Sequence, residues 1–158
     1  MKFGISTNRD MLNNDYKEIL QLLTEAEVDF LLVGAYALAA HGYPRSTGDI
    51  DIWINPTPEN AKKTYDAIIK FGAPLFDLQI EDLYKIGNVF QIGIAPRRID
   101  ILTGISGVIF SEAKEDFIEL ELYEMTLPFI SLEMLIRNKE ATGRDKDKID
   151  LKKLKKLL

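Results

Sequence analysis

The chain has 158 residues, of which 46% are hydrophobic, and this length and composition suit one compact domain with a buried core. It contains no cysteine, which excludes disulfides, thiolate metal ligands and cysteine nucleophiles. Its formal net charge of −5 argues against a protein that binds nucleic acid through an overall positive field, although the lysine-rich C-terminal segment is a local basic patch.

No apolar run reaches the roughly 20 residues that a membrane-spanning helix needs, so we expect no membrane partner. The first ten residues lack the apolar centre of a secretion signal, which favours a cytoplasmic location. We expect a single domain over residues 1–158, with its core at about 14–130 and a helical C-terminal segment over 131–158.

The first half of the chain predicts helices that alternate with strands. The clearest helix begins at Thr57-Pro58-Glu59, which supplies a cap, a proline in the first turn and an early acid, and it ends at Gly72. The expected helices are 14–26, 35–40 and 58–71, and the expected strands are 29–33 and 49–54.

The second half predicts a hairpin of strands 88–94 and 97–102, with Ala95-Pro96 as its turn. Ser131 is expected to cap a helix that ends at Thr142-Gly143. Further helices are expected in part of 75–85 and over 106–114, 132–141 and 145–158, and short strands over 119–122 and 126–130. The fold class is α/β (α+β): a small mixed β-sheet flanked by helices, with C-terminal helices.

Two aspartates alternate with isoleucines in the segment Asp49–Ile54. In a strand, Ile50 and Ile52 point to one face, while Asp49 and Asp51 point to the other, about 6.5–7 Å apart. Two like charges so close repel each other, and a divalent cation such as Mg²⁺, which prefers oxygen ligands, reverses that penalty. The segment therefore predicts a metal site; the alternative is an edge strand whose acids face water.

A third acid, Asp100, lies in a second alternating segment. Ile99 and Ile101 are expected to face the core there, with Asp100 and Arg98 on the other face. If the two strands are neighbours, the three acids form a set suited to two-metal phosphoryl or nucleotidyl transfer. The alternative role for Asp100 is an ion pair with Arg98 or Arg97.

Gly34 lies between a buried strand and a short helix, where backbone amides can approach an anion. We expect Gly34 and Ala35 to lie beside Asp49 and to contact phosphate. In the intervening loop, Arg45 is a candidate phosphate clamp and Thr47 a candidate hydroxyl donor. The alternatives are a turn requirement for Gly34 and a solvated loop for Arg45.

The ordered set Gly34-Ala35, Asp49-Ile50-Asp51-Ile52 and Arg98-Ile99-Asp100-Ile101 resembles the signature of the DNA polymerase β-like nucleotidyltransferase superfamily. The resemblance is greatest to small prokaryotic members related to minimal nucleotidyltransferases and to toxin–antitoxin nucleotidyltransferase components. Segments 40–49 and 136–150 look typical of that group. Ala35 departs from the signature's Gly or Ser, so one hydroxyl that could contact phosphate is absent while the backbone amide remains.

The resemblance implies a nucleotidyltransferase-like fold and a role for each matching residue. The three acids Asp49, Asp51 and Asp100 would hold Mg²⁺ or Mn²⁺, and Asp100 would also help to deprotonate the acceptor hydroxyl. Gly34 and the amides that follow it would hold the triphosphate. Lys139, in the charged C-terminal motif, is the candidate for a second phosphate contact.

The charged C-terminal motif has a plainer interpretation as surface ion pairs. At helical spacing, Asp147 can pair with Arg144, and Asp150 can pair with Lys146 or Lys153. Such pairs are worth only about 0.2–0.5 kcal/mol each.

The sequence therefore predicts metal-dependent transfer of a nucleoside monophosphate from a nucleoside triphosphate to a hydroxyl of an unidentified acceptor, with release of pyrophosphate. A protein, an RNA or a small molecule could carry that hydroxyl. The alternative is a toxin–antitoxin type interaction module that acts mainly by binding a protein partner, with weak or no catalysis.

Overall fold

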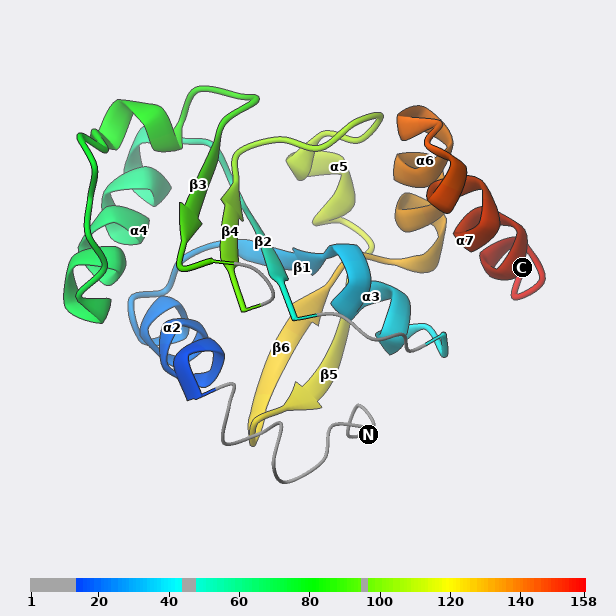
Figure 1. Cartoon of the computed structure of the whole chain (residues 1–158), viewed down its shortest axis with the longest axis horizontal. Helices are drawn as coiled ribbons and strands as arrows, with labels where there is room; N and C mark the ends of the chain where they lie inside the picture. Colours follow the sequence, from blue (N-terminus) through cyan, green and yellow to red (C-terminus); the bar gives the residue numbers. More distant parts are fainter. Residues whose placement is uncertain (1–13, 44–47, 95–96) are drawn as a thin grey trace.

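A six-stranded mixed sheet forms the centre of the computed structural model, which describes residues 14–43, 48–94 and 97–158 (Figure 1). The strands, in the spatial order β3-β4-β2-β1-β6-β5, are β1 (Phe30–Val33), β2 (Ile50–Ile54), β3 (Val89–Ile92), β4 (Ile99–Leu102), β5 (Ile118–Leu122) and β6 (Met125–Phe129). The helices are α2 (Asn14–Glu25), α3 (Gly34–Ala40), α4 (Pro58–Phe71), α5 (Phe110–Ala113), α6 (Leu132–Thr142) and α7 (Asp145–Lys155), with a 3₁₀ helix η1 (Ile80–Leu83).

Strands β1, β2 and β4 form the middle of the sheet. β2 is antiparallel to β1 and parallel to β4, while β6 runs parallel to β1 on the other side. The β3–β4 and β5–β6 pairs are antiparallel. The mixed sheet with flanking and C-terminal helices confirms the predicted fold class.

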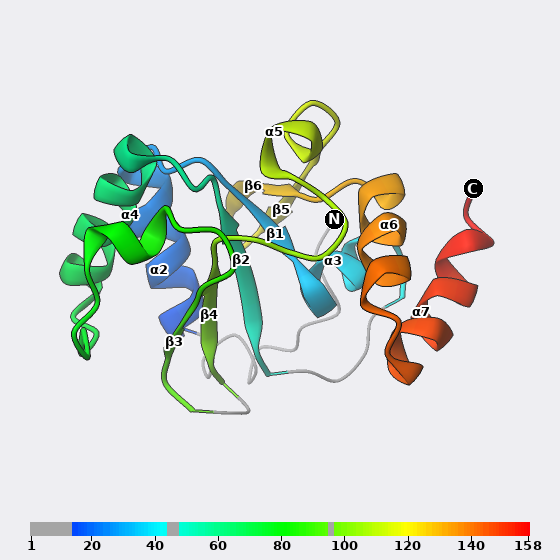
Figure 2. The same cartoon turned by 90° about the horizontal axis from the view of Figure 1, so that it is seen from above.

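Helices cover the sheet on both sides. Helices α2 and α4 lie together on one side, and α6 and α7 lie on the other (Figure 2). On β2 the three isoleucines Ile50, Ile52 and Ile54 are completely buried, as their strand periodicity predicts. Among the described residues, no helix is long and apolar enough to cross a membrane.

Local capping signals set the ends of the two best-predicted helices. The Thr57 side chain accepts a hydrogen bond from the Asn60 amide, and Gly72 ends α4 in the left-handed conformation. At α6, the Ser131 hydroxyl accepts from the Met134 amide. These contacts satisfy amides that the first helical turn leaves unpaired, which confirms the predicted starts of both helices.

The helix predicted over 106–114 is wrong in its first half, because α5 begins only at Phe110. Ile105 and Val108 form an isolated antiparallel bridge around a turn, and Gly107 has a φ of +79°. A Cβ on Gly107 would lie 2.6 Å from Cβ of Ala141 in α6. Tight packing against α6 therefore holds this segment as a turn.

Two smaller predictions have mixed outcomes. Of the segment 75–85, only Ile80–Leu83 is helical, as a 3₁₀ turn. The β3–β4 hairpin is confirmed, but its predicted turn at Ala95-Pro96 lies outside the described residues.

Candidate active site

The parallel pairing of β2 and β4 brings two of the predicted acids face to face. In this register Asp51 is the direct partner of Asp100, so both side chains project from the same face of the sheet. Asp49 immediately precedes β2 and lies two residues before Asp51. The expectation that the two acidic segments are neighbouring strands is confirmed.

Gly34 lies directly against the Asp51 carboxylate. The antiparallel register of β1 and β2 pairs Val33 with Asp51, and Gly34 follows at the start of α3 with a φ of +66°. A Cβ on residue 34 would lie only 2.1 Å from Oδ2 of Asp51. Only a residue without a side chain fits here, because the backbone conformation and the carboxylate both exclude a Cβ.

Arg98 holds two of the three acids together. Its Nε and Nη2 atoms donate to the two oxygens of Asp100 at 2.6 and 3.0 Å. Nη2 is also 3.4 Å from Oδ2 of Asp49, whose Oδ1 accepts the Arg98 backbone amide at 3.0 Å. The ion pair considered for Asp100 from the sequence is therefore present, and it extends to Asp49.

The charges of the site act on Asp51. Its burial, and then the negative charges of Asp100 and Asp49, raise the pKa of Asp51 from 3.8 to about 6. Tyr16 of α2 lies close enough to respond to the same acids, because burial and then the charges of Tyr36, Asp49 and Asp100 raise the pKa of its hydroxyl. That hydroxyl donates to the Arg98 carbonyl at 3.3 Å.

The donor set at Asp51 and Asp100 suits a hard divalent cation. Two carboxylates from neighbouring strands supply oxygen ligands, and burial together with the charges of Asp100 and Asp49 outweighs the charge of Arg98 in raising the pKa of Asp51. Within the described residues, however, no group of three or more acidic, histidine or cysteine side chains is arranged to hold a metal. Asp49 and Asp100 instead bond to Arg98.

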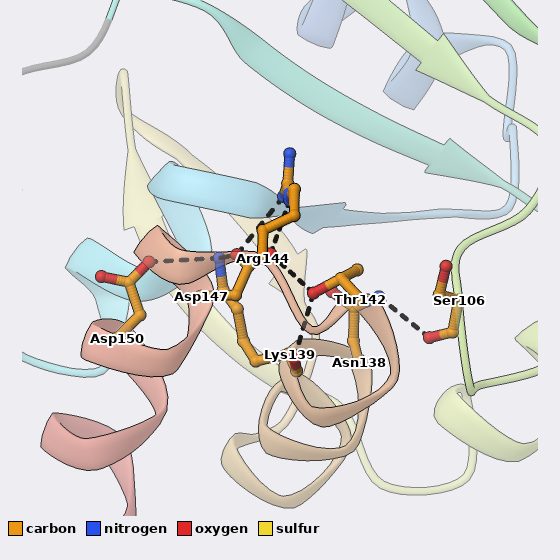
Figure 3. A network of polar contacts seen from close by, with 7 residues as sticks. All are labelled: Ser106, Asn138, Lys139, Thr142, Arg144, Asp147 and Asp150. Carbon is orange, nitrogen blue, oxygen red and sulfur yellow. Dashed lines mark hydrogen bonds and ion pairs between the residues drawn. The ribbon is translucent and has the colours of Figure 1, made fainter.

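Lys139 belongs to a second polar cluster, which joins α6 to α7 (Figure 3). Its ammonium group lies 3.0 Å from Oδ1 of Asp147 and 3.3 Å from Oδ2 of Asp150. The Thr142 hydroxyl and the Arg144 guanidinium both donate to Oδ2 of Asp147 at 2.6 Å. Five side chains therefore converge from the end of one helix and the start of the next.

The interpretation of these acids as surface decoration is wrong. Asp147 is completely buried, and Asp150 is 3% exposed. Burial alone would raise the pKa of Asp147, but the hydrogen bonds from Arg144, Thr142 and Lys139 outweigh it and hold the pKa far below its ordinary range. The predicted Asp147–Arg144 pair is present, and Asp150 pairs with Lys139.

The remaining predicted residues divide into two groups. Gly34 and Ala35 are partly exposed at the start of α3, beside Asp51. Arg45 and Thr47 lie outside the described residues. The contact of Tyr16 with this site could not be read from the sequence, because an apolar-face tyrosine in a helix has the same spacing as an ordinary core residue.

Three solved structures resemble this chain in fold. A candidate nucleotidyltransferase from Thermotoga maritima aligns with a TM-score of 0.63 at 17% identity, over 95% of this chain and 96% of that one. The lincosamide antibiotic adenylyltransferase LnuA, in its lincomycin-bound form, aligns with a TM-score of 0.60 at 16% identity, over 92% and 97%. The antibiotic-resistance factor ANT(2'')-Ia aligns with a TM-score of 0.60 at 14% identity, over 91% and 82%.

Comparison of the sequence with known proteins assigns this chain to no family. No family model matches the chain, and no curated protein matches it. The structural likeness therefore shows a fold shared with nucleotidyltransferases. None of these three structures is described as a toxin–antitoxin component, so that alternative gains no support.

Proposed function

We propose that this chain is a divalent-metal-dependent nucleotidyltransferase, which moves a nucleoside monophosphate from a nucleoside triphosphate to a hydroxyl group. The observation that carries the proposal is the pairing of Asp51 with Asp100 on one sheet face, with Gly34 packed against Asp51. Two facing carboxylates, of which Asp100 is paired with Arg98, at a strand end that packs against a glycine suit binding of a metal and a triphosphate. The fold shared with nucleotidyltransferases supports the same reaction class.

The carboxylates divide the reaction between them. Mg²⁺ or Mn²⁺, held by Asp51 and Asp100 with Asp49 as a third ligand, would neutralise charge on the transferring phosphate. Asp100 accepts the proton of the acceptor hydroxyl. The oxygen of that hydroxyl then bonds to the α-phosphorus, the bond from that phosphorus to the bridging oxygen breaks, and pyrophosphate leaves.

Positive and neutral donors bind the triphosphate. The amides at Gly34 and Ala35 contact the phosphates beside Asp51, and Arg45 and Thr47 keep the phosphate-binding roles predicted from the sequence. Lys139 keeps the role of a second phosphate contact predicted from the sequence, although its ammonium group is bonded to Asp147 and Asp150 in the buried cluster between α6 and α7.

Arg98 holds the acids in the metal-free site. Its guanidinium bridges Asp49 and Asp100 and so limits their mutual repulsion. We expect divalent metal to replace that charge compensation, which frees Arg98 to contact phosphate.

Labelled transfer assays test the proposal. Each of the four triphosphates, labelled at the α-phosphate, is incubated with Mg²⁺ and with protein, RNA and small-hydroxyl acceptor pools, and label transfer and pyrophosphate are measured. Asp51→Asn should abolish transfer, and Asp66→Asn, which removes an exposed acid on α4, should not. The proposal fails if no pool is labelled, or if Asp51→Asn transfers as well as the wild type.

A further inference from the structure

The charge of the chain is divided unequally along its length. Residues 131–158 contain nine lysine and arginine residues and five aspartate and glutamate residues, which gives this segment a net charge of +4. The whole chain has a net charge of −5, so residues 1–130 have a net charge of −9. A basic segment in an otherwise acidic chain is typical of a surface that binds an anionic partner.

Helix α7 carries most of this positive charge on its solvent-facing side. Its buried residues Asp147, Asp150 and Leu154 lie toward α6, the helix against which α7 packs. Figures 1 and 2 show α7 at the periphery of the molecule, with α6 between it and the sheet. Six lysines occupy the rest of the helix surface and its C-terminal cap, and all are exposed: Lys146, Lys148, Lys152, Lys153, Lys155 and Lys156.

Neighbouring acids do not neutralise these lysines. Asp147 and Asp150 are buried, and both bond to Lys139 of α6. Within the described ranges, the one ion pair of these six lysines joins Lys148 to Asp145 at 3.9 Å, and both of its groups are largely exposed. An exposed pair of this kind contributes little, so the six positive charges are available to a partner.

The exposed face of α7 suits a phosphate backbone better than a lipid surface. A helix that lies in a membrane interface needs a broad apolar face to insert. Within α7, all of which the structure describes, Ile149 is the one large apolar side chain that is largely exposed, and Leu157 and Leu158 follow the helix. The lysines instead recur at a spacing of one helical turn, about 6 Å of rise, in the row Lys148, Lys152 and Lys156.

We propose that the surface formed by the six lysines of α7 binds the phosphate backbone of a nucleic acid strand and does not read its base sequence. Lysine ammonium groups contact phosphates as point charges and release the counterions of the strand, which makes binding depend on salt. Because residues 1–130 are acidic, the strand should stay at α7 and not spread over the protein. This inference goes beyond the proposed function and needs neither the acids of the sheet nor a metal.

Salt titration with an RNA probe tests the inference. The intact protein is titrated into a fluorescein-labelled oligouridine of about 20 nucleotides at KCl concentrations of about 50–200 mM, and fluorescence anisotropy gives the affinity. If all six lysines contact phosphate, the logarithm of the association constant should fall with the logarithm of the salt concentration with a slope of about −4. Unlabelled oligothymidine should compete, because it has the same backbone charge. Absence of binding at about 50 mM KCl, or absence of competition, overturns the proposal.

Two matched variants locate the binding surface. One removes three charges from α7 by the substitutions Lys152→Gln, Lys153→Gln and Lys156→Gln. The control removes three charges from α4 by Lys62→Gln, Lys63→Gln and Lys70→Gln. Two of the α4 lysines already lie 2.9 and 3.8 Å from an acid one turn away, so that helix offers less unpaired charge. Glutamine favours a helix about as well as lysine does, so both variants should remain folded.

The α7 variant should bind oligouridine at least about tenfold more weakly than the wild type at about 100 mM KCl, with a salt slope of about −2. The α4 variant should bind as the wild type does. Because both variants change the net charge by the same amount, equal weakening would mean that only the overall charge acts. That result, or unchanged binding by the α7 variant, overturns the proposal.

Competition between polyanions identifies the partner. Phosphatidylserine vesicles and polyglutamate present negative charge without a nucleic acid backbone, and oligouridine should bind more tightly than either at equal charge concentration. Tighter binding of the vesicles would make α7 a membrane-binding surface, and tighter binding of polyglutamate a surface for acidic proteins; either result overturns the inference. Label transfer without oligouridine binding contradicts only this inference, whereas oligouridine binding without label transfer contradicts only the proposed function.

Discussion

At the scale of single residues, ionisation of Asp51 destabilises the folded protein. It lies opposite Asp100 and two residues from Asp49. Its burial, together with these two charges, raises its pKa to about 6. The ordinary pKa of an aspartate in an unfolded chain is about 3.9, so the folded protein binds this proton more tightly than the unfolded chain does. The contribution of protonated Asp51 to the stability of the folded protein is therefore greatest below about pH 4 and is lost as the pH rises through 6.

Asp51→Asn should stabilise the metal-free protein. Amide replaces carboxylate and removes the repulsion, so at pH 7.5 the free energy of unfolding should rise by up to about 3 kcal/mol. Thermal melting in a chelating buffer measures the effect. The gain should disappear below about pH 3, where wild-type Asp51 is protonated in both the folded and the unfolded state. A lower melting temperature at pH 7.5 would instead identify Asp51 as a structural partner.

Gly34→Ala should disrupt the same position sterically. A Cβ would meet Oδ2 of Asp51 at 2.1 Å, in addition to the strain of a positive φ. Gly143→Ala is the matched control, because Gly143 has a φ of +64° and no atom within 4 Å of its added Cβ. In both variants the strain of a positive φ should lower the free energy of unfolding by about 1 kcal/mol. Only Gly34→Ala should lower it by about 1–3 kcal/mol more. Equal melting temperatures for the two variants would contradict the steric overlap between a Cβ at residue 34 and the Asp51 carboxylate.

At the scale of elements, the contact between α6 and α7 depends on one buried acid. Asp147→Asn removes the charge that pairs with Lys139 and Arg144, so it should lower the free energy of unfolding by about 3 kcal/mol at pH 7. Asp145→Asn, two residues earlier on α7, changes a fully exposed acid and should have little effect. Chemical denaturation of both variants measures the difference.

The effect of Asp147 should depend on pH in the opposite direction to that of Asp51. The pKa of Asp147 is lowered in the folded protein, so its stabilisation is complete above pH 4 and declines as the pH falls toward the folded value. The difference between wild type and Asp147→Asn should therefore shrink below pH 4. A difference that stays constant between pH 7 and pH 3 would exclude an ionised Asp147 as the source.

Elements with strong local signals were predictable from the sequence, and elements set by tertiary contact were not. Caps at Thr57 and Ser131 fix helix starts through bonds within one turn. The turn at Gly107 instead depends on packing against α6, far along the chain. The Lys139–Asp150 pair was missed for a related reason, because it crosses the break between two helices, where helical spacing no longer applies.

The candidate site shows the same division. Strand periodicity alone puts Asp49 and Asp51 on one face, because successive side chains in a strand alternate. The facing position of Asp100 requires the β2–β4 register, and the contact of Gly34 with Asp51 requires the β1–β2 register. Pairing registers are set by the whole core, so the sequence predicted the members of the site better than their contacts.

At the scale of the whole molecule, the site lies on the most enclosed part of the sheet. β1, β2 and β4 each have a strand on both sides, whereas β3 and β5 are the edges. In hydrogen-exchange mass spectrometry of the intact protein, amides of β1 and β2 should exchange slowest, and those of β3 and β5 faster. Slow exchange confined to an edge strand would contradict this order.

The close fit of Gly34 against Asp51 also links the two positions in evolution. A side chain at position 34 fits the sheet only if residue 51 has a shorter side chain than aspartate. Such a residue would remove one of the proposed metal ligands. Homologous chains should therefore either keep both residues or lose both together. A lineage that has lost both would retain the fold without the proposed metal site, so this one contact separates chains that can carry out the proposed reaction from chains that keep only the fold.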